Sequence, residues 1–124
     1  MASRVPLVGP SAILLALMAS GLNGQAFAFH GYLPVSEAAR AARLKELEAD
    51  SRSQARTQVF IETPYRNAAM LATLVATLSP RTRLAVAADL TLPTESVAMR
   101  PVADWRGVDS AVYQRRPAIF LLQA

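Results

Sequence analysis

Apolar residues occur along the chain in short blocks that polar, glycine or proline residues separate. Five of these blocks are rich in branched, alanine and aromatic residues and predict β-strands. They cover residues 26–33, 57–62, 82–88, 95–100 and 117–122. Residues 4–8 predict a further short strand at the beginning of the chain.

Longer blocks with apolar residues three or four positions apart predict helices. The first begins at Gly9-Pro10-Ser11 and is expected to end near Ser20, with Gly21 as its C-terminal cap. Ser36 is a favourable N-cap for a second helix that runs to about residue 49. The polar residues 50–56 that follow predict a loop.

The second half of the chain contains shorter elements. A third helix is expected to begin at Thr63-Pro64, because proline is tolerated in the first turn, and to end before Ser79-Pro80. Residues 102–106 predict a helical turn that packs Trp105, and residues 107–116 predict a loop. Strands that alternate with helices indicate a single α/β domain with one mixed sheet of about five strands, flanked by helices.

Composition excludes several kinds of site. The 124 residues suffice for one domain with a modest core, and 52% are hydrophobic. There is no cysteine and only one histidine, His30, which excludes a thiolate metal site and makes a histidine metal centre improbable. We therefore expect no metal, a reducing compartment such as the cytoplasm, and a structural role for His30.

The formal net charge is +4, and almost all cations are arginines. Arginine suits phosphate and carboxylate groups, so RNA or another anionic partner is one interpretation. The arginines are scattered along the sequence rather than clustered, and a general arginine and alanine bias is the stronger explanation for them. Charge alone therefore does not establish a nucleic-acid partner.

The first 28 residues also allow a secretory signal. Arg4 would be its basic end, and Ala26-Phe27-Ala28 resembles a cleavage site. Proline and glycine at positions 6, 9 and 10 interrupt the apolar run, which is shorter than the about 20 residues that cross a bilayer. We favour a ligand-binding turn at this position and expect no membrane contact.

Three carboxylates lie beside predicted strand ends: Glu62, Asp89 and Glu95. Ligands of open α/β sheets bind at the carboxyl edge of the strands, although each carboxylate could equally cap a turn. Gly9 allows close backbone approach, and the helix after it presents free N–H groups to an anionic or hydroxyl-rich ligand. The segment 62–66, Glu-Thr-Pro-Tyr-Arg, repeats this arrangement of strand end, carboxylate and helix start.

Four segments in fixed order carry a family resemblance: GPSAILLALMASGL, FAFHGYLP, VFIETPYRN and VAADLT. Together they resemble the C-terminal half of the tetrapyrrole methylase family of S-adenosylmethionine-dependent methyltransferases. The similarity covers residues 5–122. It is greatest to the bacterial group that methylates a ribose 2′-hydroxyl in small-subunit rRNA.

The resemblance implies two α/β domains with S-adenosylmethionine in the cleft between them. It implies that the cofactor-binding residues of this chain are Gly9, Ser11, Ala12, Ile61, Glu62, Ala88, Asp89, Leu90, Pro117 and Ala118. It further implies that Arg66 orients the substrate or braces Glu62. The reaction would be in-line methyl transfer, which needs orientation of two reactants and neither a covalent nucleophile nor a metal. No individual catalytic residue is implied.

The resemblance also bears on partners. Residues 1–124 would form the C-terminal domain, and the family's N-terminal domain lies outside them, so we expect activity to depend on that domain. Expected partners are rRNA or the small ribosomal subunit, and either a second copy of the chain or the missing domain. The alternative is a non-catalytic module of the same fold that binds a small ligand or dimerises.

Overall fold

The computed structural model describes residues 10–124; the strand predicted over residues 4–8 and the expected site residue Gly9 lie outside them. The helices are α1 (Pro10–Ser20), α2 (Glu37–Gln54), α3 (Asn67–Thr77) and α4 (Val102–Trp105). The strands are β1 (Phe27–Tyr32), β2 (Thr57–Ile61), β3 (Arg83–Ala88), β4 (Ser96–Pro101) and β5 (Ala118–Gln123). The predicted α/β class with one mixed five-stranded sheet is confirmed.

The strands lie in the order β1-β2-β5-β3-β4. β1 pairs with β2 in parallel, whereas β5 is antiparallel to both of its neighbours, β2 and β3, and β4 is antiparallel to β3. The carboxyl ends of β1, β2 and β3 therefore meet the beginnings of β4 and β5 at one end of the sheet. We call this the Ala88 end, and the other, where β3 begins and β4 and β5 finish, the Arg83 end.

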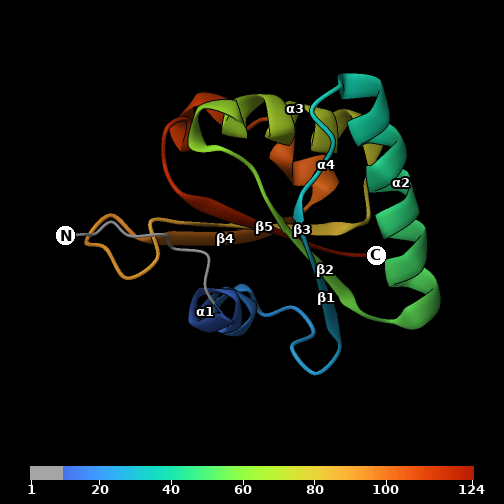
Figure 1. The fold of residues 1–124 in the computed structure, drawn as a ribbon, viewed down its shortest axis with the longest axis horizontal. Coiled ribbons are helices and arrows are strands. Elements are labelled where there is room, and N and C mark those ends of the chain that lie inside the picture. Colours follow the sequence, from blue (N-terminus) through green and yellow to red (C-terminus); the bar gives the residue numbers. More distant parts are fainter. Residues whose placement is uncertain (1–9) are drawn as a thin grey trace.

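Helices cover both faces of the sheet (Figure 1): α1 lies on one face, and α2, α3 and α4 lie on the other. Because side chains alternate across a strand, β2, β3 and β5 contribute to both cores. Val59, Ala85 and Leu121 pack beneath α1. On the other face the rings of Phe60 and Phe120 stack, with centroids 5.7 Å apart.

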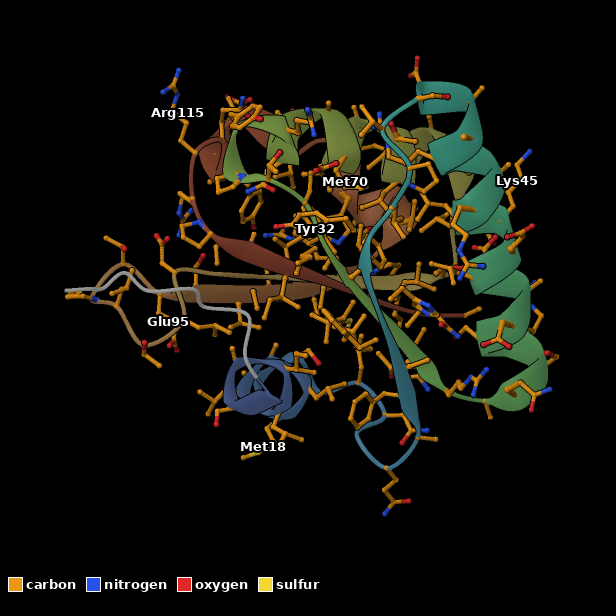
Figure 2. The ribbon with its side chains drawn as sticks, in the orientation of Figure 1. Met18, Tyr32, Lys45, Met70, Glu95 and Arg115 are labelled. Carbon is orange, nitrogen blue, oxygen red and sulfur yellow. The ribbon has the colours of Figure 1, made fainter. Side chains whose placement is uncertain are left out.

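Helix α1 is apolar on all sides. Ala16 and Leu17 are buried against the sheet, whereas Leu14, Leu15 and Met18 are exposed. Figure 2 shows Met18 pointing away from the sheet, and its side chain is 77% exposed. The outward face of α1 is thus an apolar surface of the kind that marks association sites. No helix of residues 10–124 is both long and apolar enough to cross a membrane.

Helix α2 differs from its prediction at one end only. Its N-cap is confirmed, since the Ser36 hydroxyl accepts a hydrogen bond from the Ala39 N–H. The predicted loop over residues 50–56 is wrong, because the helix continues to Gln54 and ends at Ala55 in the left-handed conformation. The extra turn is held by the buried Ser51 hydroxyl, which donates to the Arg56 carbonyl.

Two other predicted elements begin or fold differently. The first turn after Thr63 is a 3-10 helix, Pro64–Arg66, and α3 starts only at Asn67. The predicted loop over 107–116 contains a second 3-10 helix, Ser110–Tyr113, which the Asp109 side chain caps by accepting from the Ala111 N–H. The predicted helical turn is confirmed as α4, in which Trp105 is buried and donates to the Leu84 carbonyl at 2.8 Å.

Candidate functional site

The Ala88 end of the sheet collects most of the residues expected to bind the cofactor. Ile61 lies opposite Ile119, and Ala88 lies opposite Ala118. The Asp89 N–H donates to the Pro117 carbonyl at 2.9 Å. Three segments that are far apart in the sequence, at 61–62, 88–90 and 117–118, therefore form one continuous edge.

Glu62 immediately follows β2, and its side chain is only 3% exposed. Its Oε1 accepts from the Thr63 N–H at 2.7 Å and from the Thr63 hydroxyl at 3.3 Å. Arg66 Nη1 lies 3.8 Å from the same oxygen. Within residues 10–124 these interactions all use Oε1, which leaves Oε2 as an acceptor for a ligand.

Arg66 is held from two sides. Its guanidinium is near Glu62 and lies over the Tyr65 ring, 5.3 Å from the ring centroid. The side chain remains 36% exposed. This position is compatible with both expected roles, bracing Glu62 and orienting a substrate, and both stay predictions.

Asp89 has a different environment from Glu62. Its backbone is left-handed, with φ of 55°, and its Oδ2 accepts from Arg116 Nε and from the Thr94 hydroxyl, both at 2.8 Å. The carboxylate is thus engaged within the protein. Glu95 is likewise a capping residue, since its Oε1 accepts from the Thr91 N–H at 2.8 Å. These contacts fix the shape of the loop over residues 89–95, which contains Leu90.

Arg116 is a functional candidate that the sequence analysis missed. Besides Asp89, its guanidinium donates to the Val112 and Thr94 carbonyls and to the Ser96 hydroxyl. It joins the segment before β5 to the loop after β3, so it positions both sides of the edge. A basic residue directly before the proline of the last strand was the only signal in the sequence.

Tyr32 is a second residue that was missed. It pairs with Ile61 across a register shift between Phe29 and Tyr32, where Gly31 adopts a left-handed φ of 69°. The ring is 63% exposed at the Ala88 end. An aromatic residue within the FAFHGYLP segment was its signal.

The first turn of α1 approaches this edge from one face. Ser11 is exposed, and Ala12 is half-buried against the apolar cluster that also contains Ile61 and Leu90. This shared cluster is the connection between the predicted binding turn and the strand ends. Beyond its other terminus, the helix is anchored at the Arg83 end, where the Asn23 N–H donates to Gln123 Oε1 at 2.9 Å.

His30 lies away from these residues in a polar network. Its Nε2 is 2.5 Å from Gln58 Oε1, and Arg43 approaches its Nδ1 at 3.5 Å. Gln58 in turn donates to Asp50, whose pKa is lowered chiefly by its hydrogen bonds with Arg56. The predicted structural role of His30 agrees with this geometry. No group of His, Asp and Glu side chains in residues 10–124 is arranged to hold a metal ion.

A separate open groove of about 440 Å³ lies on the α3 and α4 side of the molecule. It is lined mainly by Leu71, Val75, Trp105 and Val108, with Arg106 at its margin. None of the expected cofactor-binding residues contributes to it.

The Ala88 end offers a ligand polar groups rather than apolar surface. Ile61, Ala88, Leu90 and Ala118 are all buried, between 0% and 7% exposed, so they fix the strand ends from within the core. Glu62 Oε2 can accept a hydrogen bond from a hydroxyl group.

Comparison with known proteins connects this geometry to a family. No family model matches the chain. It is 36% identical over 100 residues to the ribosomal RNA small subunit methyltransferase I of Vibrio cholerae, and 40% identical over 103 residues to that of Mesorhizobium japonicum. These relatives bear out the resemblance to the tetrapyrrole methylase family. The matches cover 81% of this chain but only 33% and 34% of the relatives, so it spans about a third of their length.

Solved structures show the same fold. The methyltransferase CobJ superposes with a TM-score of 0.57 at 18% identity, over 90% of this chain and 47% of that protein. A diphthine synthase superposes with a TM-score of 0.63 at 13% identity, over 91% of this chain and 45% of that protein. The fold that the resemblance implies is thereby confirmed.

Proposed function

We propose that this chain is the C-terminal, cofactor-binding part of an S-adenosylmethionine-dependent methyltransferase. The proposed acceptor is a ribose 2′-hydroxyl of small-subunit rRNA, and the proposed place of action is the cytoplasm. The relatives' names support small-subunit rRNA as the acceptor, and the family resemblance suggests the ribose 2′-hydroxyl as the methylated group. The observation that carries the cofactor assignment is the convergence of residues 61–62, 88–90 and 117–118 at one end of the sheet.

In this proposal the chain works mainly by positioning. S-adenosylmethionine supplies a methyl group already activated on its sulfonium. Glu62 Oε2 accepts from a ribose hydroxyl, and the buried residues Ile61, Ala88, Leu90 and Ala118 fix the strand ends that face the nucleoside part. Arg66, braced against Glu62, offers its free N–H groups to a phosphate of the acceptor. Orientation of this kind supplies about 7–11 kcal/mol of a barrier.

A second chain segment must complete the cleft. The exposed apolar residues of α1, Leu14, Leu15 and Met18, lie on the same face of the sheet as the half-exposed Phe29 of β1. Such a surface is covered in proteins by another domain or subunit. We propose that the N-terminal domain of the family, or a second copy of this chain, packs here.

The test is a chimera with the Vibrio cholerae relative in which this chain replaces its matched 100 residues. We expect the chimera to transfer a radioactive methyl group from S-adenosylmethionine to small ribosomal subunits. Ser11→Trp should abolish transfer by filling the space beside the strand ends. Ser53→Trp, the same change on the exposed side of α2, is the matched control and should leave transfer intact.

A folded chimera without methyl transfer would contradict the proposal. Equal methyl transfer by Ser11→Trp and Ser53→Trp would show that the first turn of α1 is not part of the site. The second candidate is a non-catalytic binding or dimerisation module, which the apolar face of α1 favours. It predicts self-association of the chain together with an inactive chimera.

A further inference from the structure

Arginines that are scattered in the sequence lie together at the Arg83 end of the sheet. Arg83 opens β3 and pairs with Pro101, and Arg100 pairs with Leu84, so the two side chains leave this edge on opposite faces of the sheet. The Ala103 N–H of α4 donates to the Pro80 carbonyl at 3.1 Å. Arg81 directly follows Pro80 and therefore lies beside α4. Arg106 follows one turn after Ala103. We call Arg81, Arg83, Arg100 and Arg106 the basic rim.

The basic rim carries uncompensated charge. Within residues 10–124, none of its four arginines forms an ion pair. The carboxylate nearest in sequence is Asp104, which is exposed and likewise forms no ion pair with a described residue. Arg81, Arg100 and Arg106 are exposed, and Arg83 is half-buried.

One arginine of the rim is held in a fixed position. The guanidinium of Arg100 lies over the buried Trp105 ring, 5.0 Å from its centroid. Its plane and charge are thus oriented before any partner arrives, which reduces the entropy lost on binding. A planar guanidinium held in this way matches the geometry of a phosphate group.

Helix α2 extends the positive surface. Glu48 accepts hydrogen bonds from the Ser79 N–H and the Thr82 hydroxyl, so this part of α2 lies against the segment that contains Arg81. Lys45 and Arg52 are three residues before and four residues after Glu48, and both are exposed. Figure 2 shows Lys45 extending outward from α2. These positions put two more cations on the same side of the molecule.

We propose that the basic rim binds the phosphate backbone of RNA, as a second contact separate from the Ala88 end. Four arginines that form no ion pair within residues 10–124, against the two neighbouring carboxylates of Asp104 and Glu48, leave a net positive charge. Such a group of arginines fits a polyanion better than a small anion, because each can contact a different phosphate. The strand β3 has six residues, so the rim lies roughly 20 Å from the candidate methyl-transfer site. The inference that the polyanion is RNA rests on the proposed function.

The test measures binding of the 124-residue chain to a fluorescein-labelled RNA hairpin by fluorescence anisotropy. The rim variant is Arg81→Gln with Arg106→Gln, since both side chains are exposed and neither makes a described structural contact through its guanidinium. The matched control is Arg43→Gln with Arg115→Gln, which removes the same charge. Arg43 faces His30, and Figure 2 shows Arg115 on the side of the molecule away from Lys45.

We expect the rim variant to bind roughly tenfold more weakly than the original chain in moderate salt. The slope of log affinity against log salt should fall in magnitude by about 2, or about 1 for each lost phosphate contact. The control should change affinity by less than about twofold. Unchanged circular dichroism and an unchanged urea midpoint would verify that both variants fold.

Three results would contradict RNA binding by the basic rim. They are no RNA binding by the original chain, an unchanged RNA affinity in the rim variant, or equal losses of affinity in the rim and control variants. Failure of the proposed function is separately visible in the methyl-transfer chimera. An active chimera together with an unchanged RNA affinity of the rim variant rejects RNA binding by the rim and leaves the proposed function intact. An inactive chimera with rim-dependent RNA binding rejects the methyltransferase assignment and retains the RNA surface.

Discussion

Arg116→Met should loosen the candidate site by removing the connection between the loop after β3 and the segment before β5. The lost bonds are one charge-assisted bond to Asp89 at 2.8 Å and three to the neutral acceptors on Val112, Thr94 and Ser96. Hydrogen bonds to charged groups contribute about 1.5–3 kcal/mol each, and breaking a fully buried ion pair costs about 3–5 kcal/mol. The side chain of Arg116 is 24% exposed and that of Asp89 is 9% exposed, so water recovers part of the loss. We therefore expect the free energy of unfolding to fall by about 2–3 kcal/mol.

Urea unfolding followed by Trp105 fluorescence measures this loss. Trp105 is the only tryptophan and is 1% exposed, so its emission reports unfolding of the core directly. With a typical urea dependence of about 1–3 kcal/mol per molar, the midpoint should fall by roughly 1–2 M. Arg115→Met, at the exposed neighbouring position, is the control and should change stability by less than about 0.5 kcal/mol.

Two results would refute this reasoning. The first is a loss below about 0.5 kcal/mol in Arg116→Met, which would mean that the guanidinium does not hold the loop. The second is strict additivity of Asp89→Asn and Arg116→Met, because residues in direct contact are expected to couple by at least about 0.5 kcal/mol.

Three further predictions concern the core, the pH dependence and the apolar face of α1. Glu48→Ala should lower the free energy of unfolding, measured in urea, by about 1–3 kcal/mol, because the Ser79 N–H and the Thr82 hydroxyl lose their acceptor. A change near zero would contradict this prediction. Burial raises the pKa of Tyr113 above its ordinary value of 10.0, so folding favours the neutral phenol, and thermal stability should be lost as pH rises beyond that value. Tyr113→Phe should flatten this alkaline decline, and identical declines would contradict the assignment. Met18→Glu should reduce concentration-dependent association in sedimentation velocity, whereas a monomeric original chain would show that the exposed face of α1 does not self-associate.

The local elements could be predicted because their signals are local. The blocks around Phe60, Val86 and Phe120 are apolar and bounded by polar or proline residues, and each is a buried strand. The cap at Ser36 follows from the preference of a hydroxyl for a free N–H. The end of α2 was misplaced because Ser51 is polar in sequence but buried, with its hydroxyl used by a backbone carbonyl.

The arrangement of the strands could not be predicted from such signals. β5 is last in the chain but central in the sheet, and nothing in residues 118–123 specifies β2 and β3 as its neighbours. The contacts that depend on this arrangement were therefore missed as well. Arg116 and Asp89 are 27 residues apart. The basic rim joins residues 81 and 106 through the pairing of β3 with β4 and the hydrogen bond from the Ala103 N–H to the Pro80 carbonyl. The candidate strand-end residues were named through family resemblance, and their roles stay predictions.

Binding of S-adenosylmethionine at the Ala88 end of the sheet can be tested most directly by NMR. Titration of the ¹⁵N-labelled chain with S-adenosylmethionine, followed by backbone amide resonances, locates the ligand even when binding is weak. We expect weak, saturable shifts confined to the amides of Glu62, Leu90 and Ala118 and to the first turn of α1. Shifts centred on the groove of Leu71 and Trp105, or no shifts at millimolar ligand, would contradict it.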